Sequence, residues 1–172
     1  MAPPTRPETF CFSDDGKVPN SPLPLIVPRG ALTPGRDDPA QSFERMFARN
    51  GWTNSWRDGI FDYHHYHSTA HEVLGIAFGS VEVRFGGESG ATLRLEPGDV
   101  VVIPAGVGHA RIGQSDDLLV VGAYAGGRDW DIVRDSDPGA IGPARRRIAE
   151  VPLPAADPVD GESGPLMKLW GG

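Results

Sequence analysis

The sequence predicts an all-β protein, and three observations lead to this prediction. The chain has 172 residues, which is long enough for one well-cored domain and short for two. It contains 23 glycines and 17 prolines, which favour short strands joined by tight turns. Long apolar runs with helical periodicity are few, whereas short runs rich in Val, Ile, Leu and Phe recur along the chain.

Two strands and one helix are predicted in the N-terminal part. Residues 8–12 and 23–28 are rich in Phe, Leu, Ile and Val, as short strands are. Asp38 is suited to cap a helix that has Pro39 at its first position and ends at residues 50–51. Three apolar side chains fall on one face of this helix: Phe43, Met46 and Phe47.

The middle of the chain is predicted to form most of the sheet. Trp52 and Trp56 flank a stretch that we interpret as a polar loop. Four strand-like runs then follow one another: 60–67, 71–78, 80–85 and 91–95. Residues 99–103 are almost wholly apolar, which is typical of a strand buried on both faces, and residues 118–124 form the last clear strand.

The alternating pattern is lost after residue 126. Residues 143–150 are predicted to form one short helix. The proline-rich stretch 151–170 is predicted to lack regular structure and to wrap over the strands. The sequence therefore predicts one domain over residues 1–172, with a core at about 55–126, N-terminal strands and a helix at 8–50, and a tail at 127–172.

The histidines are clustered. Four of the five lie in the glycine-bounded segment 59–79, and the fifth, His109, lies in a second such segment, 98–113. In a strand successive side chains point to opposite faces, so His65 and His67 share one face. The clustering indicates a common site for these side chains.

A metal centre is the first interpretation of this cluster. Glu72 follows the paired histidines closely, and imidazole and carboxylate groups are ligands for Fe, Mn, Ni, Cu or Zn. The alternative is that the histidines are structural and are satisfied by hydrogen bonds inside the fold. Three imidazoles and a carboxylate crowded into an apolar interior are costly without a cation, which favours the metal.

Two glycine-bounded motifs contain these residues. The first motif, G-x5-H-x-H-x4-E-x6-G, is met in full by Gly59, His65, His67, Glu72 and Gly79. The second motif, G-x5-P-x-G-x2-H-x3-N, is met by Gly98, Pro104, Gly106 and His109. Its last position is Gly113 instead of Asn. In this order the two motifs resemble the signature motifs of the cupin superfamily.

The resemblance implies a double-stranded β-helix, the cupin or jelly-roll barrel, with one or two short peripheral helices. It also implies a divalent metal held by three histidines and one glutamate: His65, His67, Glu72 and His109. The missing Asn lies outside this ligand set, so its loss is expected to affect a turn more than the site. A cupin that has lost its metal is the alternative, but this chain keeps all four ligands.

The resemblance extends beyond the motifs. SDDGKVPN, LPLIVPRGAL, FARNGW and HHYHSTAHEVLG are similar to segments of a bacterial family of single-domain cupins. Because single-domain cupins tend to pair, the resemblance implies a homodimer. It implies no particular substrate.

Strand parity separates Glu72 from its neighbour His71, which is expected to sit behind or outside the metal shell. Glu72 shares its face with bulky apolar residues suited to a barrel interior: Leu74, Ile76 and Phe78. His71 shares its face with smaller groups suited to an outer layer: Val73, Gly75 and Ala77. His71 would then orient the ligands by hydrogen bonding.

Two more residues are candidates for the cavity. Tyr63 has the parity of the paired histidines, so we expect it to line the cavity. Arg111 lies two residues after His109 on the same face of a regular strand. It would bind an anionic substrate or form a surface salt bridge.

The composition excludes some partners. The formal net charge is −7, which argues against nucleic acid and anionic membranes. No segment is apolar enough to span a bilayer, and the start, MAPPTRPETF, lacks a signal-peptide core, so a cytoplasmic location is expected. The single cysteine, Cys11, has no partner for an internal disulfide and is expected to be buried.

Two classes of function remain open. In the first, the chain is a metal-dependent enzyme of dioxygenase, isomerase or decarboxylase type that acts on a small oxygen-rich molecule. In the second, it is a non-catalytic module that binds a metal or a small molecule. The absence of a separate DNA-binding segment disfavours a transcription factor.

Overall fold

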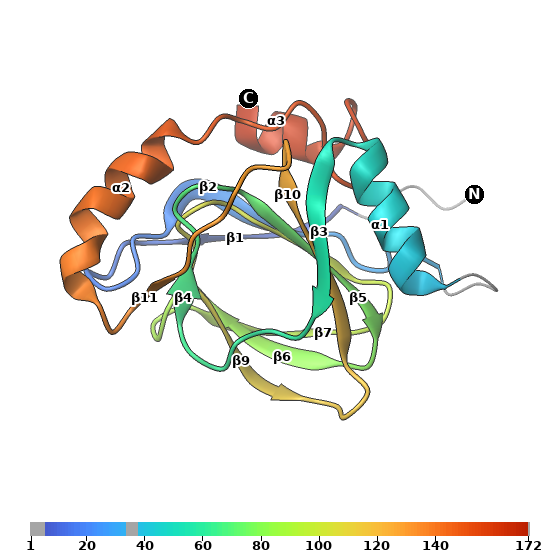
Figure 1. Cartoon of the computed structure of the whole chain (residues 1–172), viewed down its shortest axis with the longest axis horizontal. Coiled ribbons are helices and arrows are strands. Elements are labelled where there is room, and N and C mark those ends of the chain that lie inside the picture. The colour runs from blue at the N-terminus through green and yellow to red at the C-terminus, as the bar shows by residue number, and fades with distance from the viewer. Residues whose placement is uncertain (1–5, 34–37, 172) are drawn as a thin grey trace.

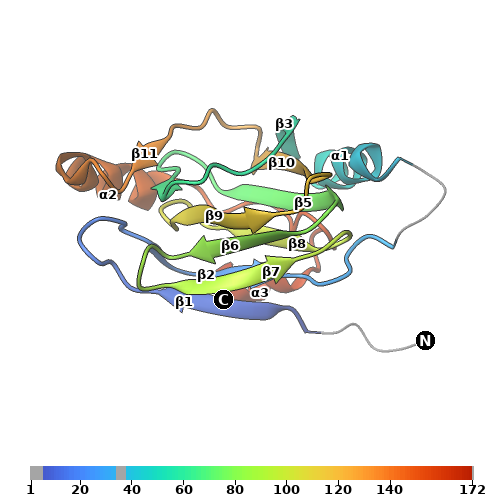
Figure 2. The same cartoon turned by 90° about the horizontal axis from the view of Figure 1, so that it is seen from below.

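The computed structural model describes residues 6–33 and 38–171. Its strands form two sheets that wrap around a common axis (Figures 1 and 2). The six-stranded sheet has the order β1 (Glu8–Phe12), β2 (Ser21–Val27), β8 (Val100–Ile103), β5 (Glu72–Phe78), β10 (Leu119–Ala125) and β3 (Trp52–Asp58). The five-stranded sheet has the order β11 (Val133–Arg134), β4 (His65–Tyr66), β9 (His109–Gln114), β6 (Val81–Phe85) and β7 (Ala91–Leu95).

All neighbouring strands in both sheets pair antiparallel. The two sheets enclose an apolar interior that includes Leu74, Ile76, Phe85, Leu95 and Val101. This arrangement is the all-β jelly-roll barrel that the sequence predicts.

Within residues 6–33 and 38–171, three α-helices lie outside the strands (Figure 1): α1 (Pro39–Arg49), α2 (Ile141–Glu150) and α3 (Pro165–Gly171). A short 3-10 helix, η1 (Pro138–Ala140), precedes α2. Asp38 caps α1 by accepting a hydrogen bond from the Ala40 backbone at 3.0 Å. None of the helices in the described residues is long and apolar enough to cross a membrane.

The outer face of the six-stranded sheet carries a second apolar layer. Phe43 and Phe47 of α1 and Trp170 of α3 pack there against Val73 and Ala77 of β5. The ring of Phe43 lies so close to β5 that a Cβ added at Gly75 would stand 2.7 Å from it. Strand β5 is therefore buried on both faces, which explains its nearly continuous apolar sequence.

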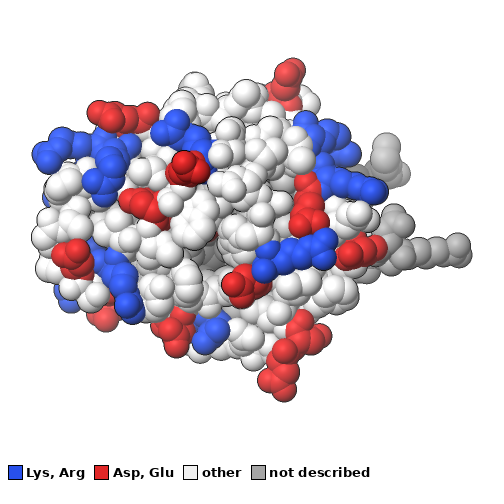
Figure 3. All heavy atoms as spheres, in the orientation of Figure 1, with Lys and Arg blue, Asp and Glu red and all other residues white. Residues whose placement is uncertain are grey.

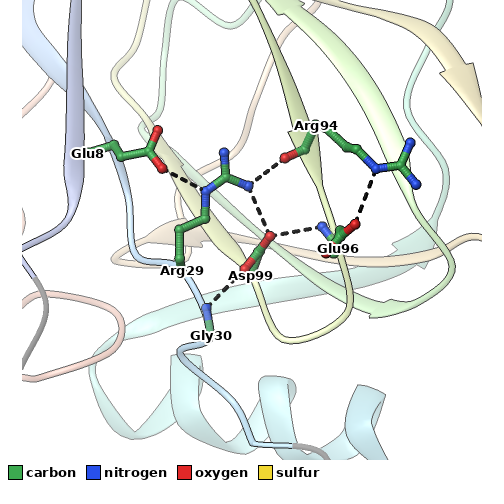
Figure 4. A network of polar contacts seen from close by, with 6 residues as sticks. All are labelled: Glu8, Arg29, Gly30, Arg94, Glu96 and Asp99. Carbon is green, nitrogen blue, oxygen red and sulfur yellow. Dashed lines mark hydrogen bonds and ion pairs between the residues drawn. The ribbon is translucent and has the colours of Figure 1, made fainter. Parts of the chain in front are cut away.

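A buried carboxylate joins the ends of several strands at the turn before β8 (Figure 4). Asp99 accepts hydrogen bonds from the backbone N–H groups of Gly30 and Glu96 and from the guanidinium of Arg29. Arg29 also pairs with Glu8 of β1 at 3.0 Å. These bonds fix the turn that leads into β8, the neighbour of β5.

Several local expectations were wrong. Residues 52–58 form strand β3 instead of a polar loop, because they pair with β10 at the edge of the sheet. The tail contains α3, which Trp170 anchors by donating a hydrogen bond to the Pro24 carbonyl at 2.8 Å. Cys11 is exposed, and Phe78, at the end of β5, is 46% exposed instead of interior.

Candidate metal centre

Short strands on opposite sides of the barrel bring the candidate ligands together. His65 in β4 and His109 in β9 are directly paired across the five-stranded sheet. His67 follows β4 by one residue and keeps the parity of His65. Glu72 begins β5 in the other sheet, next to Ile103 on one side and Tyr124 on the other.

The four side chains converge in the barrel interior and all are buried. One nitrogen from each of His65, His67 and His109 lies within 4.8 Å of the others. A carboxylate oxygen of Glu72, Oε1, lies 3.4 Å from Nε2 of His67 and 3.4 Å from Nε2 of His109. The structure therefore brings all four predicted residues together.

The backbone sets the tautomer of each of these histidines. Nδ1 of His65 lies 3.0 Å from the carbonyl oxygen of Tyr63. Nδ1 of His67 lies 2.5 Å from the carbonyl oxygen of Asp131. Nδ1 of His109 lies 3.2 Å from the carbonyl oxygen of Val107. A carbonyl oxygen only accepts hydrogen bonds, so each Nδ1 must carry the proton that it donates. The Nε2 lone pair of each neutral ring is then free to coordinate a metal.

The electrostatics of the cluster call for a positive charge. Burial disfavours the charged form of Glu72, but the adjacent His67 and His109 outweigh it and lower the pKa of Glu72 below its usual range. Burial likewise opposes charge on His67, yet Glu72 raises the pKa of His67 above its ordinary value. Burial and the neighbouring His109 lower the pKa of His65 to about 2. A carboxylate that faces imidazole lone pairs at 3.4 Å is stable only with a proton or a metal ion between them.

The cluster lies in a cavity of about 430 Å³ that opens to the surface. Figure 3 shows a hollow near the middle of this face, with acidic and basic side chains around it. Besides the four clustered residues, the lining is largely aromatic and aliphatic: Trp56, Ile60, Phe61, Leu74, Tyr124 and Trp130. Arg57, Asp58, Asp62 and Arg111 also contribute to it.

Comparison with known proteins agrees with this architecture. Residues 59–125 match the family model described as Cupin. The chain is also 43% identical over 164 residues to the "Uncharacterized protein YjlB" of Bacillus subtilis (strain 168), across 95% of this chain and 96% of that protein. The chain belongs to the cupin family. The prediction from the two motifs is thereby confirmed for the family and the fold.

Two solved structures show a partial likeness to this barrel. An acireductone dioxygenase from Bacillus anthracis with a cadmium ion in its active centre is 17% identical, with a TM-score of 0.45 over 63% of this chain and 82% of that one. The WlaRB TDP-quinovose 3,4-ketoisomerase from Campylobacter jejuni is 18% identical, with a TM-score of 0.41 over 49% of this chain and 72% of that one.

Aromatic side chains from β3 and β10 form one wall of the cupin cavity. The indole of Trp56 lies across Gly122 of β10, where an added Cβ would stand 2.2 Å from the ring. Its N–H donates a hydrogen bond to the hydroxyl of Tyr124 at 2.9 Å. Burial and then the nearby Glu72 raise the pKa of Tyr124 well above its usual range, so this phenol stays protonated.

The segment after β10 covers the other side of His67. The ring of Trp130 stacks on Tyr124 and meets His67 edge-on, with centroids 5.7 and 5.6 Å apart. The carboxylate of Asp131 accepts hydrogen bonds from the backbone N–H and the hydroxyl of Ser68. Arg147 of α2 donates to the same Ser68 hydroxyl at 2.8 Å. Residues outside the barrel thus hold the carbonyl that orients His67.

The three other predicted residues have different positions. Arg111 lines the cavity. Tyr63 is outside the cavity lining, but its carbonyl accepts the His65 hydrogen bond and its ring lies 5.5 Å from that of His65. His71 is buried on the outer face of β5, against the ring of Trp170 at 4.8 Å, and it bonds to no member of the cluster in the described contacts.

The sequence did not point to Tyr124 and Trp130 as lining residues. Tyr124 is the direct partner of Glu72 across β5 and β10, a register that spacing within one strand does not reveal. Trp130 lies beyond the last predicted strand, so no periodicity pointed to it. Gly113, which departs from the second motif, lies in strand β9 instead of the expected turn, four residues after His109.

Proposed function

We propose that this cupin is a metal-dependent enzyme that acts on a small molecule in the barrel. The ligands would be His65, His67, Glu72 and His109, around one divalent transition metal ion such as Fe, Mn, Ni, Zn or Cu. The single observation that carries the proposal is the set of three Nδ1 hydrogen bonds to backbone carbonyls. They leave three Nε2 lone pairs free beside a buried carboxylate.

The spacing of these groups fits one ion. Metal–ligand distances of about 2.0–2.2 Å place neighbouring ligand atoms roughly 3.0–3.5 Å apart on a single ion. The two distances from the Glu72 oxygen to imidazole nitrogens are both 3.4 Å. Four protein ligands of this kind also leave coordination positions open on metals that prefer five or six ligands.

A metal ion in this position would supply Lewis-acid or redox chemistry to an oxygen-rich ligand. The protein would contribute a cavity of about 430 Å³ with a largely apolar lining, which restricts water near the reacting molecule. Tyr124 would stay protonated and would keep its hydroxyl beside Glu72. Dioxygenation, isomerisation and decarboxylation are the reaction types that suit such a site.

A non-catalytic metal- or ligand-binding module is the second candidate. The observation that favours it is the scarcity of acid–base groups in the described lining apart from the four proposed ligands. Tyr124 has a pKa too high for a base, and Asp58 and Asp62 are exposed at the rim. Catalysis would therefore depend almost entirely on the metal.

Elemental analysis of protein purified without a histidine tag tests the metal site. We expect about one divalent metal ion per chain, and we expect His65→Ala to lose it. His64→Ala changes the adjacent histidine and should retain the metal. Reconstitution with each metal, followed by oxygen-uptake and product assays on a substrate panel, separates the two candidates. Turnover supports the enzyme, whereas ligand binding without turnover supports the module.

The homodimer predicted from the resemblance is part of the proposal. Sedimentation of the purified chain at micromolar concentration should give a dimer. A clean monomer at that concentration would contradict it.

A further inference from the structure

Arg111 projects from the same strand that supplies His109. The two residues share one face of β9 and are separated by about 7 Å along the strand. The backbone N–H of Arg111 donates to the Phe61 carbonyl at 2.8 Å, which ties this part of β9 to the segment before β4. Arg111 therefore lines the cavity from a fixed backbone position.

The guanidinium of Arg111 has little charge compensation. Its described contacts are a hydrogen bond to the amide oxygen of Gln114 at 2.9 Å and an ion pair with Asp62 at 3.8 Å. The Asp62 side chain is 70% exposed, so water screens this long contact. Arg57, the other arginine of the lining, makes two hydrogen bonds to the carboxylate of Glu44 at 2.7 and 3.0 Å. Of these two cations, Arg111 is the one without a carboxylate at hydrogen-bonding distance in the described contacts.

Exposed aromatic surface accompanies this cation. Phe61 is 46% exposed and Trp130 is 40% exposed, although both line the cavity. Trp56 and Tyr124 extend the aromatic lining towards Glu72. Aromatic faces at a cavity mouth favour planar, apolar ligands that stack on them or meet them edge-on.

We infer that the ligand of this cavity is a small aromatic carboxylate whose carboxylate group binds Arg111 and whose ring contacts the aromatic lining. The inference rests on the proposed function, because it names the class of molecule for the same site. A guanidinium presents a planar pair of N–H donors that matches a carboxylate. His109 and Arg111 are about 7 Å apart along β9, a separation on the scale of one aromatic ring.

A singly charged anion suits the cavity better than a doubly charged one. Asp58 and Asp62 lie at the rim with Arg111, and their charges disfavour a phosphate dianion. A carboxylate carries one charge and fits the same donors. Inorganic phosphate therefore serves as the competing anion in the test.

The test measures the binding of benzoate and 4-hydroxybenzoate, each against its neutral amide, by calorimetry. Wild-type protein loaded with Zn²⁺ should bind each carboxylate at least about tenfold more tightly than its amide. Arg111→Gln should abolish this preference and leave amide binding, metal content and thermal stability unchanged. Arg94→Gln removes the same charge from a 58% exposed side chain in β7 and should retain the preference.

Three results would overturn the inference. One is a carboxylate preference that persists in Arg111→Gln, since the metal would then be the anchor. The second is equal binding, or no binding at millimolar concentration, of each carboxylate and its amide to the wild type. The third is displacement of benzoate by equimolar phosphate. The same titrations on metal-free protein separate this inference from the metal proposal, because the Arg111-dependent preference should remain there.

Discussion

Glu72, the first residue of β5, and His71, the residue before it, point to opposite sides of the sheet, and the buried histidines on these two sides have different environments. On the inner side Glu72 faces three imidazoles whose Nδ1 atoms donate to backbone carbonyls. On the outer side Nδ1 of His71 instead accepts a hydrogen bond from the Ala105 backbone N–H at 2.9 Å. The proton of neutral His71 is therefore on Nε2, which is buried without a hydrogen-bond partner.

Burial alone therefore does not mark a histidine as a candidate metal ligand. His71 is as buried as the clustered histidines, but its available lone pair is already used and its ring packs against that of Trp170. In the cluster, a backbone carbonyl accepts a hydrogen bond from Nδ1 of each ring and leaves the Nε2 lone pair without that partner. In the proposed site, the hydrogen-bond partner of Nδ1 decides whether the Nε2 lone pair of an imidazole is free for a metal.

The largest expected effect is the difference in metal content between variants of Glu72 and a variant of its neighbour His71. Glu72→Gln, which keeps the side-chain volume, and Glu72→Ala should both strip the metal, because they remove the only carboxylate of the proposed ligand set. His71→Ala should keep most of it. Elemental analysis after dialysis against a chelator measures the difference. If His71→Ala lost the metal and Glu72→Ala kept it, the assignment of Glu72 to the proposed ligand set and of His71 to the outer side would be wrong.

The second prediction concerns the pH dependence of folding on the outer face. Burial, and then the positive charge of Arg128, lower the pKa of His71 from 6.5 to about 4. Between pH 6.5 and 4, His71 is therefore protonated in the unfolded chain but mostly neutral in the folded chain. The free energy of unfolding consequently falls as the pH falls through this range. The loss from His71 amounts to about 3 kcal/mol at pH 4 and is absent above pH 7.

Denaturant unfolding of metal-free wild type and His71→Gln between pH 7 and 4 measures this loss. The variant has no imidazole to protonate, so its free energy of unfolding should fall less steeply with decreasing pH. Using metal-free protein removes the separate effect of protons on metal binding. Parallel pH profiles would show that folded His71 accepts a proton as readily as an unfolded one.

A smaller effect is expected from the segment that orients His67. Asp131→Ala removes the carboxylate that holds Ser68, so the Asp131 carbonyl loses its fixed position beside Nδ1 of His67. Metal affinity should fall by about 10–100-fold, which is typical when a partner of a ligating histidine is lost. Competition with a chromophoric chelator measures it. Asp129→Ala, in the same segment, is the control and should bind metal as the wild type does.

The smallest effect is expected for Trp170 of α3, which packs against His71 on the outer side of the six-stranded sheet. Trp170→Phe keeps an aromatic ring beside His71 but removes the hydrogen bond to the Pro24 carbonyl. Stability should fall by about 1 kcal/mol, or a few degrees in Tm, with metal content unchanged. Leu169→Ala changes a 41% exposed residue of the same helix and should stay within about 0.5 kcal/mol of the wild type. A loss of metal in Trp170→Phe would contradict this prediction, because it would show that packing against His71 affects the proposed metal site.

The sequence predicted the parts of the molecule that depend on local spacing. Alternation in the segment 72–78 placed Leu74 and Ile76 in the interior and Val73 and Ala77 on the outer layer, as the structure has them. The two motifs predicted the family and the barrel. The identity of the metal ligands stays a prediction, and the structure brings the four named residues together.

Features that depend on pairing between distant segments were not predictable. The polar stretch at β3 becomes a strand because β10 offers it an edge, and its own residues give no strong signal. The tautomers of the histidines depend on carbonyls such as that of Asp131, which lies 64 residues after its partner His67. Spacing within a short segment carries no information on such contacts, because the two partners are separated by many residues of intervening chain.

Asp131 comes late in the chain, and this position has a consequence for the order in which the site is completed during synthesis. All four candidate ligands leave the ribosome before Asp131, and Arg147 and Trp170 follow later still. A nascent chain that ends with the last strand of the barrel therefore has its ligands but lacks the groups that fix His67 and cover His71. With the metal site proposed above, binding of the metal with native affinity would be one of the last steps in the maturation of this protein, and a barrel cut out after β10 would not reproduce it.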